Sequence, residues 1–287
     1  MTLTFEQIKQ RFQAEQATPV TPMTKADMPP TYESITPQWL TDVLANDVPG
    51  AEVESYVLGP HDDGTSNRRK IAVRWNEAGR QAGLPDKLFC KGTQSLESRY
   101  MLGMNEGVQA EVNFYNVLQQ KIDVISPPKL NMFSKWETFF RITAFDAGFE
   151  DSCIRGFTQA EEVIPPRLFA REAEVWPATL KCVDLHETMP RGMTHNDVHL
   201  KNWFIRPDGE MGINDWQNSA QGNGSRDLAY CISTAVVPEK RREWERDLLR
   251  YYIEEFAARG GPKLDFDVTF RRYRQQLFAA LAWWSGT

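Results

Sequence analysis

The sequence predicts an α+β protein, with an antiparallel sheet and a helix in its N-terminal part and mostly helices in its C-terminal part. Segments rich in β-forming residues lie in the first third of the chain, at 53–58, 70–75 and 88–91. Apolar residues at helical spacing fill much of the second half, over 166–185, 238–258 and from 267 onward. Strands and helices are therefore expected in separate parts of the chain.

The chain is expected to comprise an N-terminal extension over 1–30, an N-terminal lobe over 31–145 and a C-terminal lobe over 146–287. The extension is polar and contains Pro-rich stretches at 18–22 and 29–30, a pattern typical of a short helix followed by an extended connection. Thr36 and Pro37 then begin a helix, because threonine is a good N-cap and proline fits the first helical turn.

The composition is that of an ordinary globular protein. With 287 residues, of which 41% are hydrophobic and 25% charged, the chain can bury one full core or two lobes. A formal net charge of -6 argues against nucleic acid as the main partner, because phosphate backbones need basic surfaces. The same charge would tolerate a cationic substrate.

Cysteine spacing and hydropathy predict a cytoplasmic location. The four cysteines are far apart in the chain and form no Cys-x-x-Cys pair, so neither a disulfide framework nor a zinc knuckle is indicated. No window approaches the roughly 18 apolar residues of a membrane span, and the first residues do not form a basic and then apolar leader. Neither secretion nor membrane spanning is expected.

The segment from 194 to 216 carries most of the functional information. Asp197 lies five residues before Asn202, and Asp215 follows a short apolar run. Residues 203–205 and 211–213 are predicted to pair as short strands around a Pro-Asp-Gly turn. Such a hairpin would bring Asn202 and Asp215 to the same end.

These residue types suit the transfer of a phosphoryl group. That chemistry depends on positioning and on charge neutralisation more than on a covalent nucleophile. Asp197 can orient an acceptor hydroxyl and take its proton. Magnesium prefers oxygen ligands and is often held by one or two protein side chains, and Asn202 and Asp215 supply such oxygens.

The pattern His195-x-Asp197, then Asn202, then Asp215-Trp resembles the signature of aminoglycoside phosphotransferase and choline kinase-like enzymes, which are small-molecule relatives of the protein kinases. The resemblance implies a bilobal protein kinase-like fold with ATP between the lobes. It also implies that Asp197 is the catalytic base, that Asn202 and Asp215 bind Mg²⁺, and that His195 braces the catalytic loop. Asp227, in an Asp-Leu-Ala segment that also resembles the family, would cap a helix and anchor that loop.

In the N-terminal lobe the resemblance is thinner. Lys91, at the end of a strand, resembles the lysine that contacts the α- and β-phosphates of ATP, and Glu111 is its expected partner, with Glu106 as a substitute. Two ordinary solvated charges are the competing interpretation of Lys91 and Glu111. In the loop between the first two strands, the candidate phosphate contacts are Gly64, Thr65 and Ser66.

Three further residues near the signature are candidate contacts for phosphate or substrate: His199, Lys201 and Trp216. Lys201 could stabilise developing negative charge, with surface exposure as the alternative. The family's acidic hinge motif is missing. Only the apolar run 139–146 stands in its place, where backbone groups of 144–146 are expected to bind the adenine edge.

Several alternatives stay open. His195, Asp197 and His199 alternate as zinc ligands do in some hydrolases, although only two other histidines exist to complete such a site. His195 and Asp197 could also be a buried hydrogen-bonded pair in an ordinary loop. A choline-binding aromatic cage would draw on Trp216, Trp283 or Trp284. The competing expectation for large aromatics is burial, which we expect for Trp39, Trp176 and Trp244.

The sequence thus predicts an enzyme that uses ATP and Mg²⁺ to phosphorylate a hydroxyl group of a small molecule. An aminoglycoside, choline or ethanolamine, a sugar, a macrolide and a steroid-like alcohol all remain open as acceptors. The alternative from another class is a catalytically silent nucleotide-binding protein of the same fold. The presence of Asp197, Asn202 and Asp215 together argues against it. The sequence does not indicate an oligomeric state.

Overall fold

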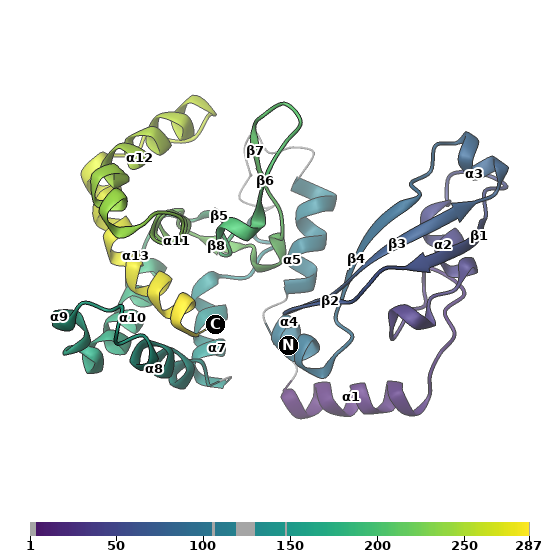
Figure 1. Cartoon of the computed structure of the whole chain (residues 1–287), viewed down its shortest axis with the longest axis horizontal. Coiled ribbons are helices and arrows are strands. Elements are labelled where there is room, and N and C mark those ends of the chain that lie inside the picture. Colours follow the sequence, from purple (N-terminus) through teal and green to yellow (C-terminus); the bar gives the residue numbers. More distant parts are fainter. Residues whose placement is uncertain (1–3, 105–106, 119–129, 147, 287) are drawn as a thin grey trace. The chain divides into compact units, whose positions relative to one another are not determined.

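The computed structural model describes residues 4–104, 107–118, 130–146 and 148–286. The chain forms two compact units, Met1–Met104 and Asn105–Thr287 (Figure 1). Glu106, the substitute partner for Lys91, lies outside the described residues. The lobe boundaries expected from the sequence remain predictions.

The first unit is built on a four-stranded antiparallel sheet. Its elements are α1 (Phe5–Ala17), η1 (Tyr32–Ser34), α2 (Pro37–Leu44), β1 (Val53–Leu58), β2 (Asp62–Asp63), β3 (Asn67–Trp75), α3 (Glu77–Gln81), β4 (Lys87–Gly92) and α4 (Leu96–Met104). The central strand β3 pairs with β1 and β2 along one edge and with β4 along the other. The three strands expected from the sequence are therefore confirmed, and the predicted hairpin loop contains the short strand β2.

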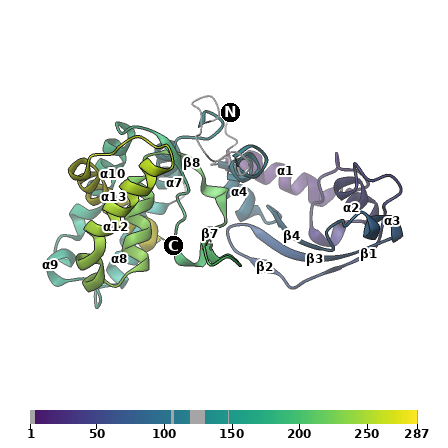
Figure 2. The ribbon, with the colours of Figure 1, turned by 90° about the horizontal axis from the view of Figure 1, so that it is seen from above.

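The residues of β3 alternate between two faces of this sheet, as a pleated strand requires. Ile71, Val73 and Trp75 are buried and pack with Leu40 of α2, which covers one face of the sheet (Figure 2). Helix α2 begins as predicted, since the Thr36 side chain accepts a hydrogen bond from the backbone N–H of Trp39.

The opposite face of the sheet carries basic and exposed apolar side chains. Cross-strand partners share a face, and the register pairs Arg68 with Lys91 and Lys70 with Phe89. Phe89 is 61% exposed and Val57, on the same face, is 69% exposed. Lys91 is thus grouped with two other cations beside an apolar surface.

The second unit is mostly helical. Its elements are α5 (Gly107–Asn113), the short π-helix η2 (Phe114–Leu118), α7 (Trp136–Asp146), α8 (Phe149–Gln159), α9 (Pro166–Phe169), α10 (Glu172–Glu187), β5 (Gly192–Thr194), η3 (Leu200–Asn202), β6 (Trp203–Ile205), β7 (Met211–Ile213), η4 (Trp216–Asn218), β8 (Ala220–Gly222), α11 (Ser225–Ala235), α12 (Pro238–Ala258) and α13 (Phe266–Gly286). The α+β fold class is confirmed, with an N-terminal antiparallel sheet and a mostly helical C-terminal part.

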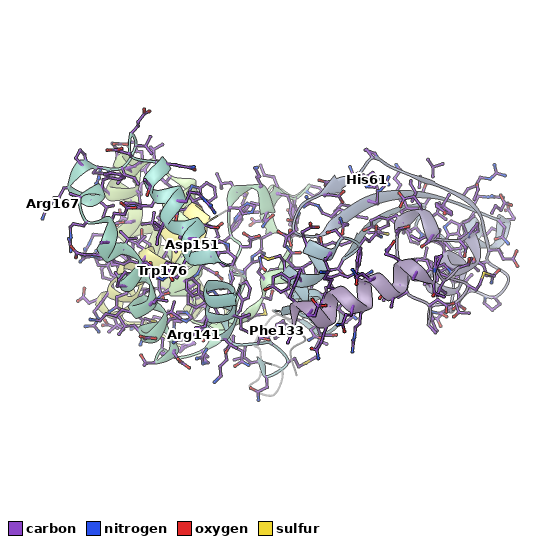
Figure 3. All side chains as sticks on the ribbon, turned by 90° about the horizontal axis from the view of Figure 1, so that it is seen from below. His61, Phe133, Arg141, Asp151, Arg167 and Trp176 are labelled. Carbon is purple, nitrogen blue, oxygen red and sulfur yellow. The ribbon has the colours of Figure 1, made fainter. Side chains whose placement is uncertain are left out.

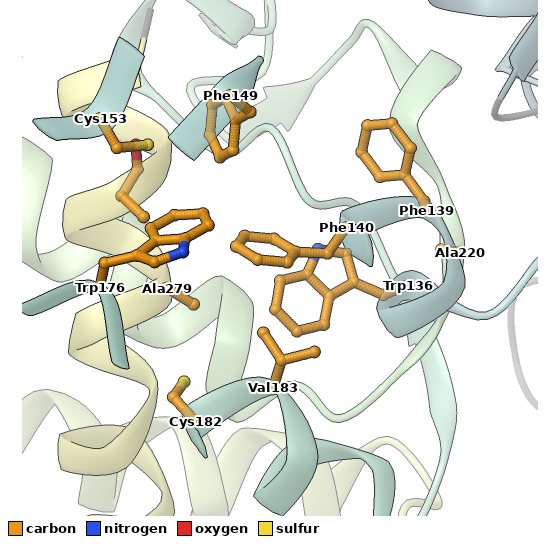
Figure 4. Packing of buried hydrophobic residues seen from close by; sticks show 11 residues of the cluster. Trp136, Phe139, Phe140, Phe149, Cys153, Trp176, Cys182, Val183, Ala220 and Ala279 are labelled. Atoms are coloured by element: carbon orange, nitrogen blue, oxygen red, sulfur yellow. The ribbon is translucent and has the colours of Figure 1, made fainter. Parts of the chain in front are cut away.

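Aromatic residues from α7, α8 and α10 form the main core of this unit (Figure 4). The Phe140 ring lies 5.3 Å from that of Trp136 and 6.1 Å from that of Trp176, between centroids. Trp176 is 7% exposed, so its predicted burial is confirmed; its position is labelled in Figure 3. This core supports the segments that lead into β5 and β8.

The run 139–146, which stands in place of the family's hinge motif, is helical. These residues belong to helix α7, in which Trp136 and Phe140, one turn apart, are fully buried. Residues 144–146 form the last turn of this helix, where the carbonyl groups have no partner within the helix, so the adenine contact expected there stays a prediction. Aromatic and β-branched residues are common in strands, but tertiary packing on one helical face overrides that local preference here.

Helix α12 has the predicted bounds but not the predicted buried face. Trp244 is 42% exposed, whereas Leu249 is fully buried. On the inward side of the helix, the side chain of Glu245 accepts a hydrogen bond from the hydroxyl of Tyr273 on α13, at 3.1 Å. A charged residue of α12 therefore faces α13, whereas Trp244, for which we expected burial, does not.

Trp39 packs against the core of the first unit while its indole N–H donates to the carbonyl of Asp27. In the described parts of the chain, no helix combines the length and apolar character needed to cross a bilayer.

Candidate active site

The candidate catalytic loop leaves β5 and turns sharply at Asn196. Strand β5 pairs with β8 through Thr194 and Ala220. Asn196 has a φ of 66°, in the left-handed region. The carboxylate of Asp227 accepts the backbone N–H groups of His195 at 2.7 Å and of Asn196 at 2.9 Å. Asp227 lies in the first turn of α11, whose N-cap position is Gly224, so it anchors the loop without being the N-cap.

His195 uses both of its ring nitrogens within the protein. Its Nε2 lies 2.8 Å from the carbonyl oxygen of Asn214, an acceptor, so Nε2 carries the proton. Its Nδ1 then accepts the backbone N–H of Asp197 at 3.2 Å. A neutral ring bonded at both nitrogens has none left for a metal ion. The zinc interpretation of His195, Asp197 and His199 is therefore disfavoured.

The predicted hairpin is formed and places Asn202 beside Asp215. Strands β6 and β7 pair in antiparallel register, with Trp203 opposite Ile213. Beyond that pair the backbone N–H of Asn214 donates to the carbonyl of Asn202 at 2.9 Å. Asp215 follows in the left-handed conformation, with φ 62° and ψ 61°. The chain thus turns at Asp215 as it enters η4.

Asp197 lies in a crowded electrostatic environment. Burial raises the pKa of its carboxyl group above the ordinary value, and the neighbouring charge of Asp215 raises it further. His199 acts in the opposite direction, with its Nε2 3.4 Å from the Asp197 carboxylate. The Asp197 side chain is 15% exposed. A carboxylate with a raised pKa is a stronger base, while remaining close enough to the surface to meet a substrate.

The amide of Asn202 is oriented by the catalytic loop. Its Nδ2 donates to the main-chain carbonyl of Asp197 at 2.8 Å, so Oδ1 is the end of the amide able to bind a cation. Together with Asp215, it offers a small set of oxygen donors in a region of negative potential. This set fits Mg²⁺, which takes oxygen ligands and keeps several waters or substrate oxygens.

The other candidate contacts near the signature have different surroundings. His199 also lies 3.4 Å from the Asn202 amide nitrogen, which joins it to the same cluster. Lys201 is exposed. The indole of Trp216 is stacked on Phe114, with ring centroids 3.8 Å apart and planes at 7°, and it contacts the His195 ring. Its rings are thus engaged by the protein, an arrangement that favours packing over substrate contact.

The aromatic-cage hypothesis finds no support among the described residues. Trp216 packs in a cluster with Phe114 and Leu118. Trp283 packs instead against Phe139 and Phe149 in the main core. Trp284 is 58% exposed. Trp216 and Trp283 belong to different clusters and do not converge on one cation-sized space.

Of the nucleotide contacts expected in the N-terminal part, Lys91 and the loop residues Gly64, Thr65 and Ser66 lie in the first unit. Lys91 is half-buried on the basic face of the sheet. Gly64 and Thr65 are exposed, but Ser66 is only 3% exposed, and its carbonyl accepts the N–H of Gly64. Glu111 lies in α5 of the second unit. Its pairing with Lys91 stays a prediction.

The hairpin loop that carries Gly64 is held by a buried arginine. The Arg69 guanidinium bonds to the carbonyl of Gly59 and to Glu33, and it lies 2.5 Å from the ring of His61, which is labelled in Figure 3. A bond to Gly59 at the start of the loop restrains its base. The tip around Gly64 is left accessible.

Sequence reasoning missed three groups that hold the site. Asn196 is buried in the catalytic loop, and its position between His195 and Asp197 was the available signal. Phe114 stacks on Trp216 from a π-helical turn, and no sequence pattern predicted that turn. Glu137 and His186 form a buried pair 2.5 Å apart, to which Arg191 is added at 2.9 Å.

The geometry of this site is that of a phosphotransferase, and comparison with known protein families agrees with this class. Residues 140–265 match the phosphotransferase enzyme family (APH). The match covers less than half of the chain but includes the catalytic loop, the hairpin and α11. Over this segment the chain is similar to the phosphotransferase enzyme family, in agreement with the sequence motifs. No match was found among curated proteins or among solved structures.

Proposed function

We propose that this protein transfers the γ-phosphoryl group of ATP to a hydroxyl group of a small molecule, with Mg²⁺ as cofactor. The observation that supports it most is the joint placement of Asp197, Asn202 and Asp215. The side-chain amide of Asn202 donates to the main-chain carbonyl of Asp197, and the main-chain carbonyl of Asn202 accepts the N–H of the residue before Asp215. The carboxylates of Asp197 and Asp215 repel each other. Holding two carboxylates near each other costs electrostatic free energy, which a bound divalent cation would offset.

Asp197 is the proposed base. It accepts a hydrogen bond from the acceptor hydroxyl and takes its proton as the acceptor oxygen bonds to the γ-phosphorus. The bond between that phosphorus and the bridging oxygen breaks at the same time, and ADP leaves. General-base assistance of this kind contributes about 100- to 10,000-fold in rate. Burial favours the role, because it raises the basicity of Asp197.

Asn202 Oδ1 and Asp215 would hold the magnesium ion, which would supply positive charge to the phosphate oxygens. His195 and Asp227 fix the loop that carries Asp197. His199 orients the Asp197 carboxylate, and Lys201 is exposed and free to move toward an anionic substrate. The basic sheet face with Lys91 suits the phosphates, and Thr65 offers an exposed hydroxyl group, whereas the Gly64 N–H already donates to the Ser66 carbonyl.

The test is ATP turnover over a panel of hydroxyl compounds: aminoglycosides, choline, ethanolamine, sugars, macrolides and sterols. We expect acceptor-dependent ADP release that disappears with EDTA and returns with Mg²⁺. Asp197→Asn should bind Mg·ATP and lose turnover, whereas Asp215→Ala should lose the Mg²⁺-dependent part of ATP binding. ATP binding without turnover for any acceptor would favour the alternative, a silent nucleotide-binding protein.

A further inference from the structure

Asn196 combines a left-handed backbone with a buried side chain. Among the described residues, the non-glycine residues with a positive φ are Asn196 and Asp215, one in each loop of the candidate site. Asn196 is only 1% exposed. Glycine would adopt this conformation without strain, and asparagine is among the residues that tolerate it best. The backbone conformation alone would favour glycine at this position, yet a buried amide side chain occupies it.

The Asn196 amide joins two segments that are far apart in sequence. Its Nδ2 donates to the hydroxyl oxygen of Thr194 at 2.9 Å and to the main-chain carbonyl of Asn218 at 2.9 Å. The Thr194 hydroxyl donates in turn to the carbonyl of Ala220 at 3.0 Å. The Asn218 carbonyl can only accept, so it fixes which end of the amide faces η4.

Two bonds together bracket Asp215. His195 reaches the carbonyl of Asn214, immediately before Asp215, and Asn196 reaches the carbonyl of Asn218, three residues after it. Both bonds start from residues directly preceding Asp197. The two loops are thus tied on both sides of the metal-ligand position, by side chains adjacent to the base.

We infer that Asn196 is a positioning residue that sets the separation between Asp197 and Asp215 by tying the catalytic loop to η4. This inference rests on the proposed function, in which these two carboxylates act together. The two carboxylates repel each other, and the bond from Asn196 to the Asn218 carbonyl opposes that repulsion. A fixed spacing presents both groups to one cation and its bound phosphate before either arrives.

The decisive variant is Asn196→Gly. Glycine keeps the left-handed turn without strain and removes only the amide, so the fold is expected to survive. Asn196→Asp is the matched isosteric change, in which a carboxylate oxygen faces the Asn218 carbonyl instead of a donor. The control is Asn131→Gly, the same substitution at an exposed position.

Two quantities are to be measured: the affinity for Mg·ADP by calorimetry, and the Mg²⁺ concentration that gives half-maximal turnover. For Asn196→Gly we expect affinity about 10-fold weaker and half-saturation at about 10-fold more Mg²⁺, in the range seen when groups behind metal ligands are removed. Asn196→Asp, if it folds, should show a larger loss. Asn131→Gly should match the parent protein.

The melting temperature without nucleotide separates positioning from a purely structural role. A structural role would lower that temperature in Asn196→Gly and leave the Mg²⁺ dependence of the folded enzyme unchanged, and this result would overturn the inference. Failure of the proposed function looks different: the parent protein itself would show neither Mg·ADP binding nor turnover.

Discussion

The imidazole of His195 donates from Nε2 to the main-chain carbonyl of Asn214 over 2.8 Å. The bond connects the residue two positions before Asp197 with the residue directly before Asp215. Because both ring nitrogens are occupied, the ring cannot rotate without losing a bond to one of the two loops. The relative position of the proposed base and the proposed metal ligand therefore depends on a side chain that need not touch the substrate.

Replacement of His195 by phenylalanine is expected to lower kcat about 10- to 100-fold, the usual effect of removing a supporting bond at a metal site. Phenylalanine keeps a ring against Trp216, so the packing of the loop should persist. Steady-state kinetics would measure the effect, and KM for ATP should change little. A variant with the parent kcat would show that the bond to Asn214 has no part in catalysis.

Asp227→Asn is expected to lower the free energy of unfolding by about 1–3 kcal/mol, because one of the two backbone N–H groups then faces an amide nitrogen instead of an acceptor. Urea denaturation measures this difference. The control is Asp247→Asn on α12, which breaks an exposed ion pair with Arg250 and should cost less than about 1 kcal/mol. Equal losses in the two variants would contradict the anchoring role.

Lys91→Ala is expected to raise KM for ATP about 10-fold or more, since a hydrogen bond to a charged group contributes about 1.5–3 kcal/mol. Lys87, four residues earlier on the same strand and the same face of the sheet, provides the control. Lys87→Ala should leave KM for ATP unchanged. An equal rise in both variants would point to the general charge of the face, and no rise in either would remove Lys91 from the proposed site.

Phe114→Leu is expected to weaken Mg·ADP binding as well as stability. Loss of the stack with Trp216 should cost about 0.5–1.5 kcal/mol beyond the lost buried area, and Trp216 directly follows Asp215. Phe169→Leu removes another stacked pair, with Phe157, between α8 and α9. That control should lose stability by a similar amount and keep its affinity. Calorimetry on both proteins distinguishes the effects. Unaltered Mg·ADP binding in Phe114→Leu would show that the stack does not contribute to the site.

Because Glu137 and His186 form a buried pair, we expect the free energy of unfolding to fall in acid. Burial alone would raise the pKa of Glu137, but hydrogen bonds from His186 and Arg191 outweigh it and hold the pKa below the ordinary value of 4.5. A depressed pKa in the folded state contributes stability that is present above pH 4.5 and is lost as the pH falls through the folded-state value. The pair should therefore weaken only in acid.

Urea denaturation of the parent and of Glu137→Gln, from pH 7 downward, measures this contribution. The parent should be more stable at pH 7 by about 3 kcal/mol, because the substitution breaks a buried pair. The gap should narrow as the pH falls below about 4.5. A gap that stays constant across that range would show that the Glu137 charge does not contribute.

Local rules were sufficient for much of the fold and for the signature of the site. Thr36 and Pro37 specified the start of α2, Pro238 specified the start of α12, and the Pro-Asp-Gly turn specified the hairpin that joins Asn202 to Asp215. Each of these signals acts between residues a few positions apart. The apolar run 139–146 shows the limit of such signals, because its composition is a local property whereas the burial of Phe139 and Phe140 in α7 depends on distant helices.

The sequence by itself determined the order of strands and helices, the candidate base and ligands, and the similarity of residues 140–265 to the phosphotransferase enzyme family. Only the tertiary structure decided that Glu245 of α12 faces inward to Tyr273, that Phe114 covers Trp216, and that Asn196 reaches Asn218. Periodicity, caps and turns act along the chain, so they are visible in it. Contacts between residues brought together by folding depend on how whole elements pack, and no local pattern specifies that packing.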